Sequence, residues 1–113
     1  MIFSVTCLPN RLHRRQGRAA LALADLLTEE LPALLWHVQA AEHTAGSLLG
    51  IRDDGDPAGR VDAVDEWARR LGVTPSWEKL AGRGGEYRAT GWHLGARVVV
   101  RAWLEESPLE VNA

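Results

Sequence analysis

The chain has 113 residues, a formal net charge of −2, and 46% hydrophobic and 25% charged residues. A chain of this length can bury one modest hydrophobic core, and its composition is ordinary for a soluble globular domain, which excludes a disordered or fibrous protein. The single cysteine, Cys7, excludes an internal disulfide, and no apolar run reaches the roughly 18 residues that span a bilayer. We therefore expect a cytoplasmic protein.

The charged residues are unevenly distributed along the chain. Residues 1–18 contain four arginines and no acidic residue, whereas the remaining 95 residues carry nine basic and fifteen acidic side chains. We predict a basic N-terminal arm over residues 1–15, a single domain over residues 16–104 and a C-terminal tail over residues 105–113. The basic residues assigned to the arm are Arg11, Arg14, Arg15 and Arg18. Arginine outnumbers lysine twelve to one, which indicates a bacterial genome rich in GC.

The first predicted helix covers residues 17–30, where apolar side chains recur at helical spacing. Its predicted apolar stripe consists of Ala20, Leu23, Leu27 and Leu31, with Leu26 beside it. Pro32 ends this helix, because the residue before a proline is driven out of the helical conformation.

A hairpin follows the first helix. Residues 34–42 alternate as a strand does, with Trp36 and Val38 on one side and Leu35 and His37 on the other. A turn near residues 43–46 leads into a second strand, SLLGIR, so we predict that these two strands pair.

The second helix has clear signals at both ends. Asp56 is placed to cap the free backbone N–H groups, and Pro57 suits the first helical position, where its missing N–H costs nothing. Val64, Trp67 and neighbouring apolar residues supply a stripe for the core, and Gly72 is a natural C-terminal stop.

Three further strands are predicted after Pro75, over residues 76–81, 86–92 and 97–104. The order is then α-β-β-α-β-β-β. It predicts an α+β fold in which an antiparallel sheet of four to five strands has two helices on one face.

The last two strands raise the question of function. A two- or four-residue turn between them pairs Trp92 with Arg97, Arg88 with Arg101 and Glu86 with Trp103, whereas a three-residue turn shifts the register by one. In the preferred register the outer face carries Arg88, Trp92, Arg97, Arg101 and Trp103. Tyr87, Ala89, Val98, Val100, Ala102 and Leu104 then face the core. Tryptophan and arginine are enriched in binding hot spots, although they also cover the outer side of sheets without any partner.

We expect a small non-enzymatic module that binds a second copy of itself or another protein through this Trp/Arg face. The alternative is a nucleic-acid-binding protein that uses the arginines of the arm and stacks bases on the sheet aromatics. No cofactor, metal or membrane partner is expected, because the sequence lacks a nucleophile elbow, paired metal ligands and a phosphate-binding loop. An enzyme would need a pocket assembled from residues distant in sequence, such as Glu42, His43 and His93.

Overall fold

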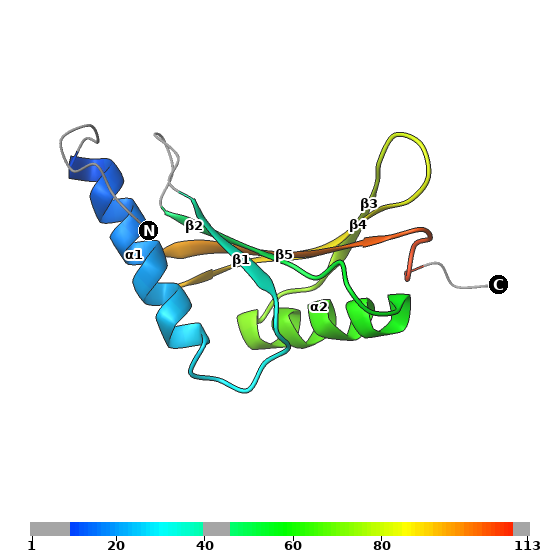
Figure 1. Ribbon diagram of the computed structural model, residues 1–113, viewed down its shortest axis with the longest axis horizontal. Coiled ribbons are helices and arrows are strands. Elements are labelled where there is room, and N and C mark those ends of the chain that lie inside the picture. The colour runs from blue at the N-terminus through cyan, green and yellow to red at the C-terminus, as the bar shows by residue number, and fades with distance from the viewer. Residues whose placement is uncertain (1–9, 40–45, 110–113) are drawn as a thin grey trace.

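The computed structural model describes residues 10–39 and 46–109, and for residues 10–13 and 15 it describes the backbone alone. Two helices and a five-stranded sheet occur in the predicted order, so the α+β fold class is confirmed (Figure 1). The elements are α1 (Asn10–Leu26), β1 (Leu35–Gln39), β2 (Ser47–Ile51), α2 (Pro57–Leu71), β3 (Ser76–Lys79), β4 (Gly85–His93) and β5 (Ala96–Leu104). Within the described residues, neither helix combines the length and the apolar character needed to cross a membrane.

The strands lie side by side in the order β1-β2-β5-β4-β3. Three neighbouring pairs are antiparallel, as predicted, whereas β2 and β5 are parallel. The parallel pair follows from the path of the chain. After β2 the chain returns along α2 to the end of the sheet where β2 began, so β3 runs in the same direction as β2. Two hairpin reversals, through β4, then give β5 that same direction. This parallel pair joins the β1–β2 hairpin to the other three strands.

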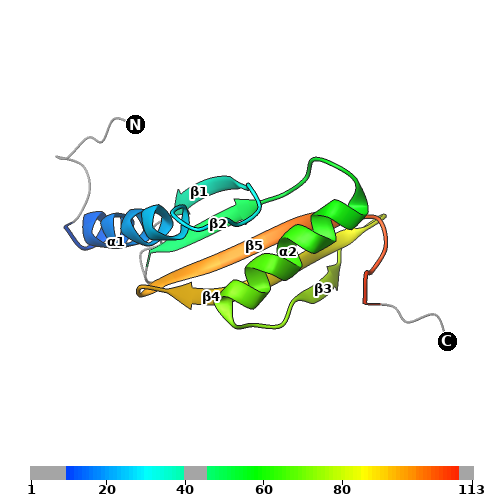
Figure 2. The ribbon, with the colours of Figure 1, turned by 90° about the horizontal axis from the view of Figure 1, so that it is seen from below.

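Helix α2 has the termini that the sequence predicts. The backbone N–H of Gly59 donates to Oδ1 of Asp56 at 2.7 Å, Pro57 occupies the first turn, and Gly72 ends the helix with a φ of 73°. One side of the helix is buried, comprising Ala63, Val64, Trp67 and Ala68. Figure 2 shows this helix crossing β5 and β4 on one face of the sheet.

Helix α1 differs from its prediction in both extent and orientation. It begins at Asn10, seven residues before the predicted start, and ends at Leu26. Its buried side chains are Ala19, Ala22 and Leu26, while Ala20 and Leu27 of the predicted stripe are exposed. Leu23 and Leu31 of the predicted stripe do pack against the core, so the prediction was wrong only in part. The error arose because α1 has two neighbouring stripes that are almost equally apolar. The buried one carries two alanines, whose small side chains let the helix backbone approach the sheet closely.

The core lies between the two helices and one face of the sheet. Buried side chains of α1 and α2 form one cluster with alternate residues of the strands, among them Leu48, Tyr87, Val98 and Val100. The predicted core-facing residues of β4 and β5 are all at most 3% exposed. The opposite side of the same strands therefore forms a second face, which neither helix covers.

Tyr87 connects the sheet to α2 and makes folding sensitive to alkali. Its hydroxyl donates to Oδ1 of Asp65 at 2.6 Å, and burial, followed by the contact with the Asp65 carboxylate, raises the pKa of Tyr87 above the ordinary value of 10.0. A raised pKa in the folded state means that the folded chain holds the phenol proton more tightly than the unfolded chain does. The resulting stability is complete below pH about 10 and is lost as the pH rises above that value.

We predict that the free energy of unfolding falls steeply above pH about 10 and that Tyr87→Phe removes most of this slope. Because Tyr87 is the single tyrosine of the chain, a spectrophotometric titration of phenolate absorption reports this group alone. Urea unfolding of the wild type and the variant at several alkaline pH values supplies the stability. Equal slopes for the two proteins, or a wild-type phenol that titrates at its ordinary value, contradict the prediction.

Candidate functional site

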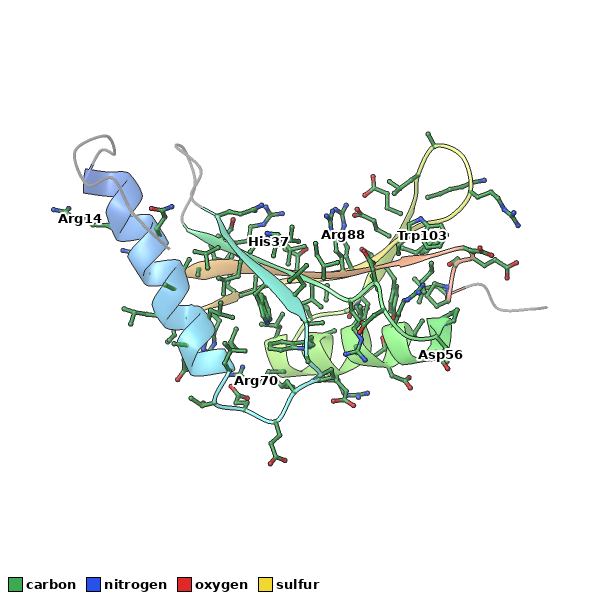
Figure 3. All side chains as sticks on the ribbon, in the orientation of Figure 1. Arg14, His37, Asp56, Arg70, Arg88 and Trp103 are labelled. Carbon is green, nitrogen blue, oxygen red and sulfur yellow. The ribbon has the colours of Figure 1, made fainter. Side chains whose placement is uncertain are left out.

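The β4–β5 hairpin has the preferred register of the sequence analysis. Trp92 lies opposite Arg97, Arg88 opposite Arg101 and Glu86 opposite Trp103. The turn consists of Leu94 and Gly95, whose φ values of 48° and 80° are both positive, as the tightest two-residue hairpin turns require. The predicted sheet residues therefore share the face that points away from α2. Figure 3 shows Arg88 and Trp103 on this side of the sheet, opposite Arg70 and Asp56.

We call this surface the open face, and it extends over all five strands. Through the pairing of β2 with β5, the side chains of the β1–β2 hairpin continue the face formed by β4 and β5. The sequence analysis missed this half of the face, which comprises Leu35, His37, Gln39, Ser47, Leu49 and Ile51. The alternation of β1 indicated its outward residues, but nothing in the sequence indicated that β2 pairs with β5. His37 lies on the same side as Arg88 in Figure 3.

Apolar side chains make up much of the open face. Leu35 is 65% exposed and Trp92 62%, whereas Trp103 is 38% exposed. Trp103 is the more enclosed tryptophan because its ring packs over Gly84, where an added Cβ would lie 2.6 Å from ring atom Cζ2. Leu49, Ile51 and Val99 are half-buried between these exposed residues. The face thus has a continuous aliphatic centre with one tryptophan toward each end.

An ionic network neutralises two of the three arginines. Oε1 of Glu86 accepts from Arg101 at 2.9 Å, and its Oε2 lies 3.7 Å from Arg88. Arg88 also pairs with Glu78 on β3. These carboxylates relieve the repulsion between Arg88 and Arg101, which lie directly opposite each other. Arg97, in contrast, is exposed and forms no ion pair with another described residue.

The two ends of the open face therefore differ in charge. At the α1 end, Trp92 lies opposite Arg97. At the other end, Trp103 lies opposite Glu86, next to Glu78, and its backbone N–H donates to Oδ1 of Asp53 at 3.0 Å. The side chains of Asp53, Glu86, Arg101 and Trp103 line a hollow of about 150 Å³ there. One end presents a tryptophan with a cation that is unpaired among the described residues. The other presents a tryptophan beside Asp53, Glu78 and Glu86, whose three negative charges exceed the two positive charges of Arg88 and Arg101 by one.

Part of the predicted basic arm is helical. The backbone positions of its four arginines belong to α1, while the side chains of Arg11 and Arg15 lie outside the described part of the chain. Arg14 and Arg18 are exposed. Arg14 points away from the sheet (Figure 3), and the Cδ of Arg18 lies against Gly95 in the β4–β5 turn. Of the two arm side chains that the structure describes, Arg14 therefore lies away from the open face and Arg18 contacts the β4–β5 turn.

Of the residues considered for an enzyme pocket, His93 alone lies in the part of the chain that the structure describes. Glu42 and His43 lie outside it, and Nε2 of His93 lies 2.7 Å from Oδ2 of Asp25, which connects β4 to α1. Across residues 10–39 and 46–109, no three His, Cys, Asp or Glu side chains form a group that could hold a metal ion. Comparison of the chain with protein-family models, curated proteins and solved structures finds no match. The open face is therefore the candidate site on which a functional proposal rests.

Proposed function

We propose that this protein is a small interaction module that associates with a second copy of itself through the open face. The observation that carries the proposal is a sheet face that no described helix or strand covers and that bears two tryptophans and an aliphatic centre. Monomeric proteins rarely expose an extensive apolar surface of this kind unless it has a partner. Tryptophan and arginine, which lie side by side at Trp92 and Arg97, are the side chains most often found in binding hot spots.

The charges of the open face favour a protein partner over nucleic acid. Binding to phosphates needs cations that are free to replace counterions. Arg88 and Arg101 are instead paired with Glu78 and Glu86, which leaves the middle of the face neutral. A neutral face with an apolar centre is typical of the buried part of a protein interface.

The opposite charges at the two ends favour a second copy in antiparallel orientation. A two-fold axis that lies between the faces, perpendicular to the strands, places the Trp92 end of one copy over the Trp103 end of the other. Each Arg97 then lies over the partner's Trp103, beside the partner's Glu86 on the adjacent strand β4, and both tryptophans of each copy are covered. A parallel arrangement would instead place like ends over each other and leave both Arg97 side chains without a carboxylate.

The size of the face suits a stable dimer. Five strands spaced by about 4.8 Å, two of them nine residues long, give a projected area of about 500 Å². The accessible area of a surface covered by side chains exceeds its projection, and standard interfaces bury about 800 Å² per partner. The open face therefore provides most or all of the area that a specific association requires.

The test is the substitution Trp92→Ser, which removes the most exposed tryptophan and leaves the core untouched. Light scattering after size-exclusion chromatography gives the molar mass. For the wild type we expect an even number of copies of the 12.4 kDa chain. The variant should have half the wild-type mass, with its dissociation constant raised at least about tenfold. Circular dichroism should show an unchanged fold.

A matched control is Leu21→Ser, which removes an apolar side chain that is 71% exposed on α1, away from the open face. It should keep the wild-type mass. A monomeric wild type, or a Trp92→Ser protein of wild-type mass, overturns the proposal. Nucleic acid that copurifies with the wild type, detected by absorbance at two wavelengths, would favour the nucleic-acid alternative instead.

A further inference from the structure

The two edges of the sheet are protected unequally against pairing with another chain. At one edge, β3 is four residues long, follows Pro75, and carries Glu78 and Lys79. Short length, proline and charge are the features by which proteins keep edge strands from pairing. At the other edge, β1 has the sequence LWHVQ, which contains no proline and no acidic, lysine or arginine residue. It therefore lacks these protective features.

The outer side of β1 has no strand beside it in the described residues. β1 is the first strand in the sheet order, and its backbone pairs with β2 alone. Figure 2 shows it at the margin of the sheet. An edge strand presents a row of backbone N–H and C=O groups on this side, ready to bond with another strand.

We propose that β1 pairs with β1 of a second copy in antiparallel orientation, which joins two sheets into one continuous sheet of ten strands. A two-fold axis at His37 places Trp36 opposite Val38 of the second copy and Leu35 opposite Gln39. Trp36 and Val38 point to the core side, where both are half-buried. Pairs of an aromatic and a β-branched side chain stabilise antiparallel strands, so the sequence of β1 is complementary to itself.

The absence of charge on β1 is the reason for choosing a second copy over a foreign peptide. An edge that recognises an acidic or basic peptide needs an opposite charge beside the added strand, and β1 supplies none. Its own sequence, uncharged and rich in strand-forming residues, meets the requirements of the site.

This edge contact is independent of the association through the open face. The axis of the edge contact is perpendicular to the sheet, so the open faces of both copies remain on the same side. The axis of the face contact lies parallel to the sheet. Perpendicular two-fold axes that intersect combine into a closed assembly of four copies, and we place both axes near the middle of the strands. The wild type should then contain four copies, and loss of either contact should leave two.

The experiment is His37→Lys in the Trp92→Ser background, where the face contact is already lost, because His37 also lies on the open face. His37 is exposed, so the substitution should not disturb folding, and it places two lysines opposite each other at the two-fold axis. Like charges directly opposite each other destabilise strand pairs. By light scattering we expect four copies for the wild type, two for Trp92→Ser and one for the double variant. In the same Trp92→Ser background, His37→Gln should keep two copies, as should Ser76→Lys, which adds the same charge at the β3 edge.

Hydrogen exchange measured by mass spectrometry separates the edge contact from the face contact. In the Trp92→Ser background, the amide hydrogens of residues 35–39 should exchange more slowly as the protein concentration rises, because pairing occupies the outer backbone groups of β1. His37→Lys should abolish this concentration dependence.

If Trp92→Ser is already monomeric, or if its residues 35–39 exchange at a rate independent of concentration, the edge proposal is wrong while the face proposal stands. If His37→Lys halves the mass but Trp92→Ser leaves it unchanged, the face proposal fails and the edge proposal stands.

Discussion

Replacing Trp67 with alanine should lower the free energy of unfolding by about 3–5 kcal/mol, as truncation of a fully buried tryptophan does. Trp67 is 1% exposed. Its ring meets that of Trp36 edge to face, with 5.2 Å between centroids and 73° between planes. Its Nε1 donates a hydrogen bond of 2.9 Å to the carbonyl oxygen of Pro32. The substitution removes all three contributions and leaves a cavity between α2 and the sheet.

The measurement is urea unfolding followed by circular dichroism, with Trp67→Phe as the control. Phenylalanine keeps an aromatic ring beside Trp36 but leaves the Pro32 carbonyl without its donor, so its cost should be smaller, about 1–3 kcal/mol. A cost below about 1 kcal/mol for the alanine variant would show that Trp67 does not organise the core. Small domains are stable by only about 5–15 kcal/mol, so the alanine variant should lose a large fraction of its stability and unfold at a clearly lower temperature.

Trp67 also matters for the open face. It holds Trp36 of β1 on the core side and Pro32 in the segment that leads into β1. The position of β1 therefore depends on a side chain on the opposite side of the sheet. The outward direction of Leu35 and His37 depends on it as well. Loss of self-association in Trp67→Ala would report this dependence rather than a contact with the partner.

Local sequence signals were enough to predict the elements whose structure is determined locally. A two-residue turn between Trp92 and Arg97 fixes every pair of the β4–β5 hairpin, because side chains alternate with a period of two. The ends of α2 follow from the capping chemistry of Asp56 and Gly72. In each case the interacting groups are close in sequence, so residue type and spacing carry the necessary information.

The remaining features depend on contacts between distant parts of the chain. The choice between the two apolar stripes of α1 is decided by how closely Ala19 and Ala22 approach the sheet, which the residue pattern does not indicate. Likewise, Leu49 joins the open face only because β2 lies beside β5, and that pairing depends on the path of α2 beneath the sheet. The arginines and tryptophans of the face were found from one hairpin, while its aliphatic centre needed the complete fold.

A charge exchange between the two ends of the open face should test the antiparallel arrangement directly. Arg97→Glu alone places a glutamate beside the partner's Glu86 at both symmetric contacts, and Glu86→Arg alone places two arginines together in the same way. Each variant should weaken the face contact by about tenfold or more, since like charges brought together in an interface are unfavourable. The experiment uses the chain without a change at position 37, because a lysine there would itself lie on the open face.

Mixing the two variants in equal amounts should restore the association. In the mixed pair, the glutamate introduced at position 97 of the first variant meets the arginine introduced at position 86 of the second at one contact. The native Glu86 and Arg97 meet at the other contact, so both contacts are complementary. Light scattering should give the mixture twice the mass of either variant alone. Arg69→Glu, an exposed change on α2 away from the open face, should keep the wild-type mass. A parallel face-to-face arrangement would not bring residues 97 and 86 together, so a mixture that behaves like its separate components would exclude the antiparallel orientation.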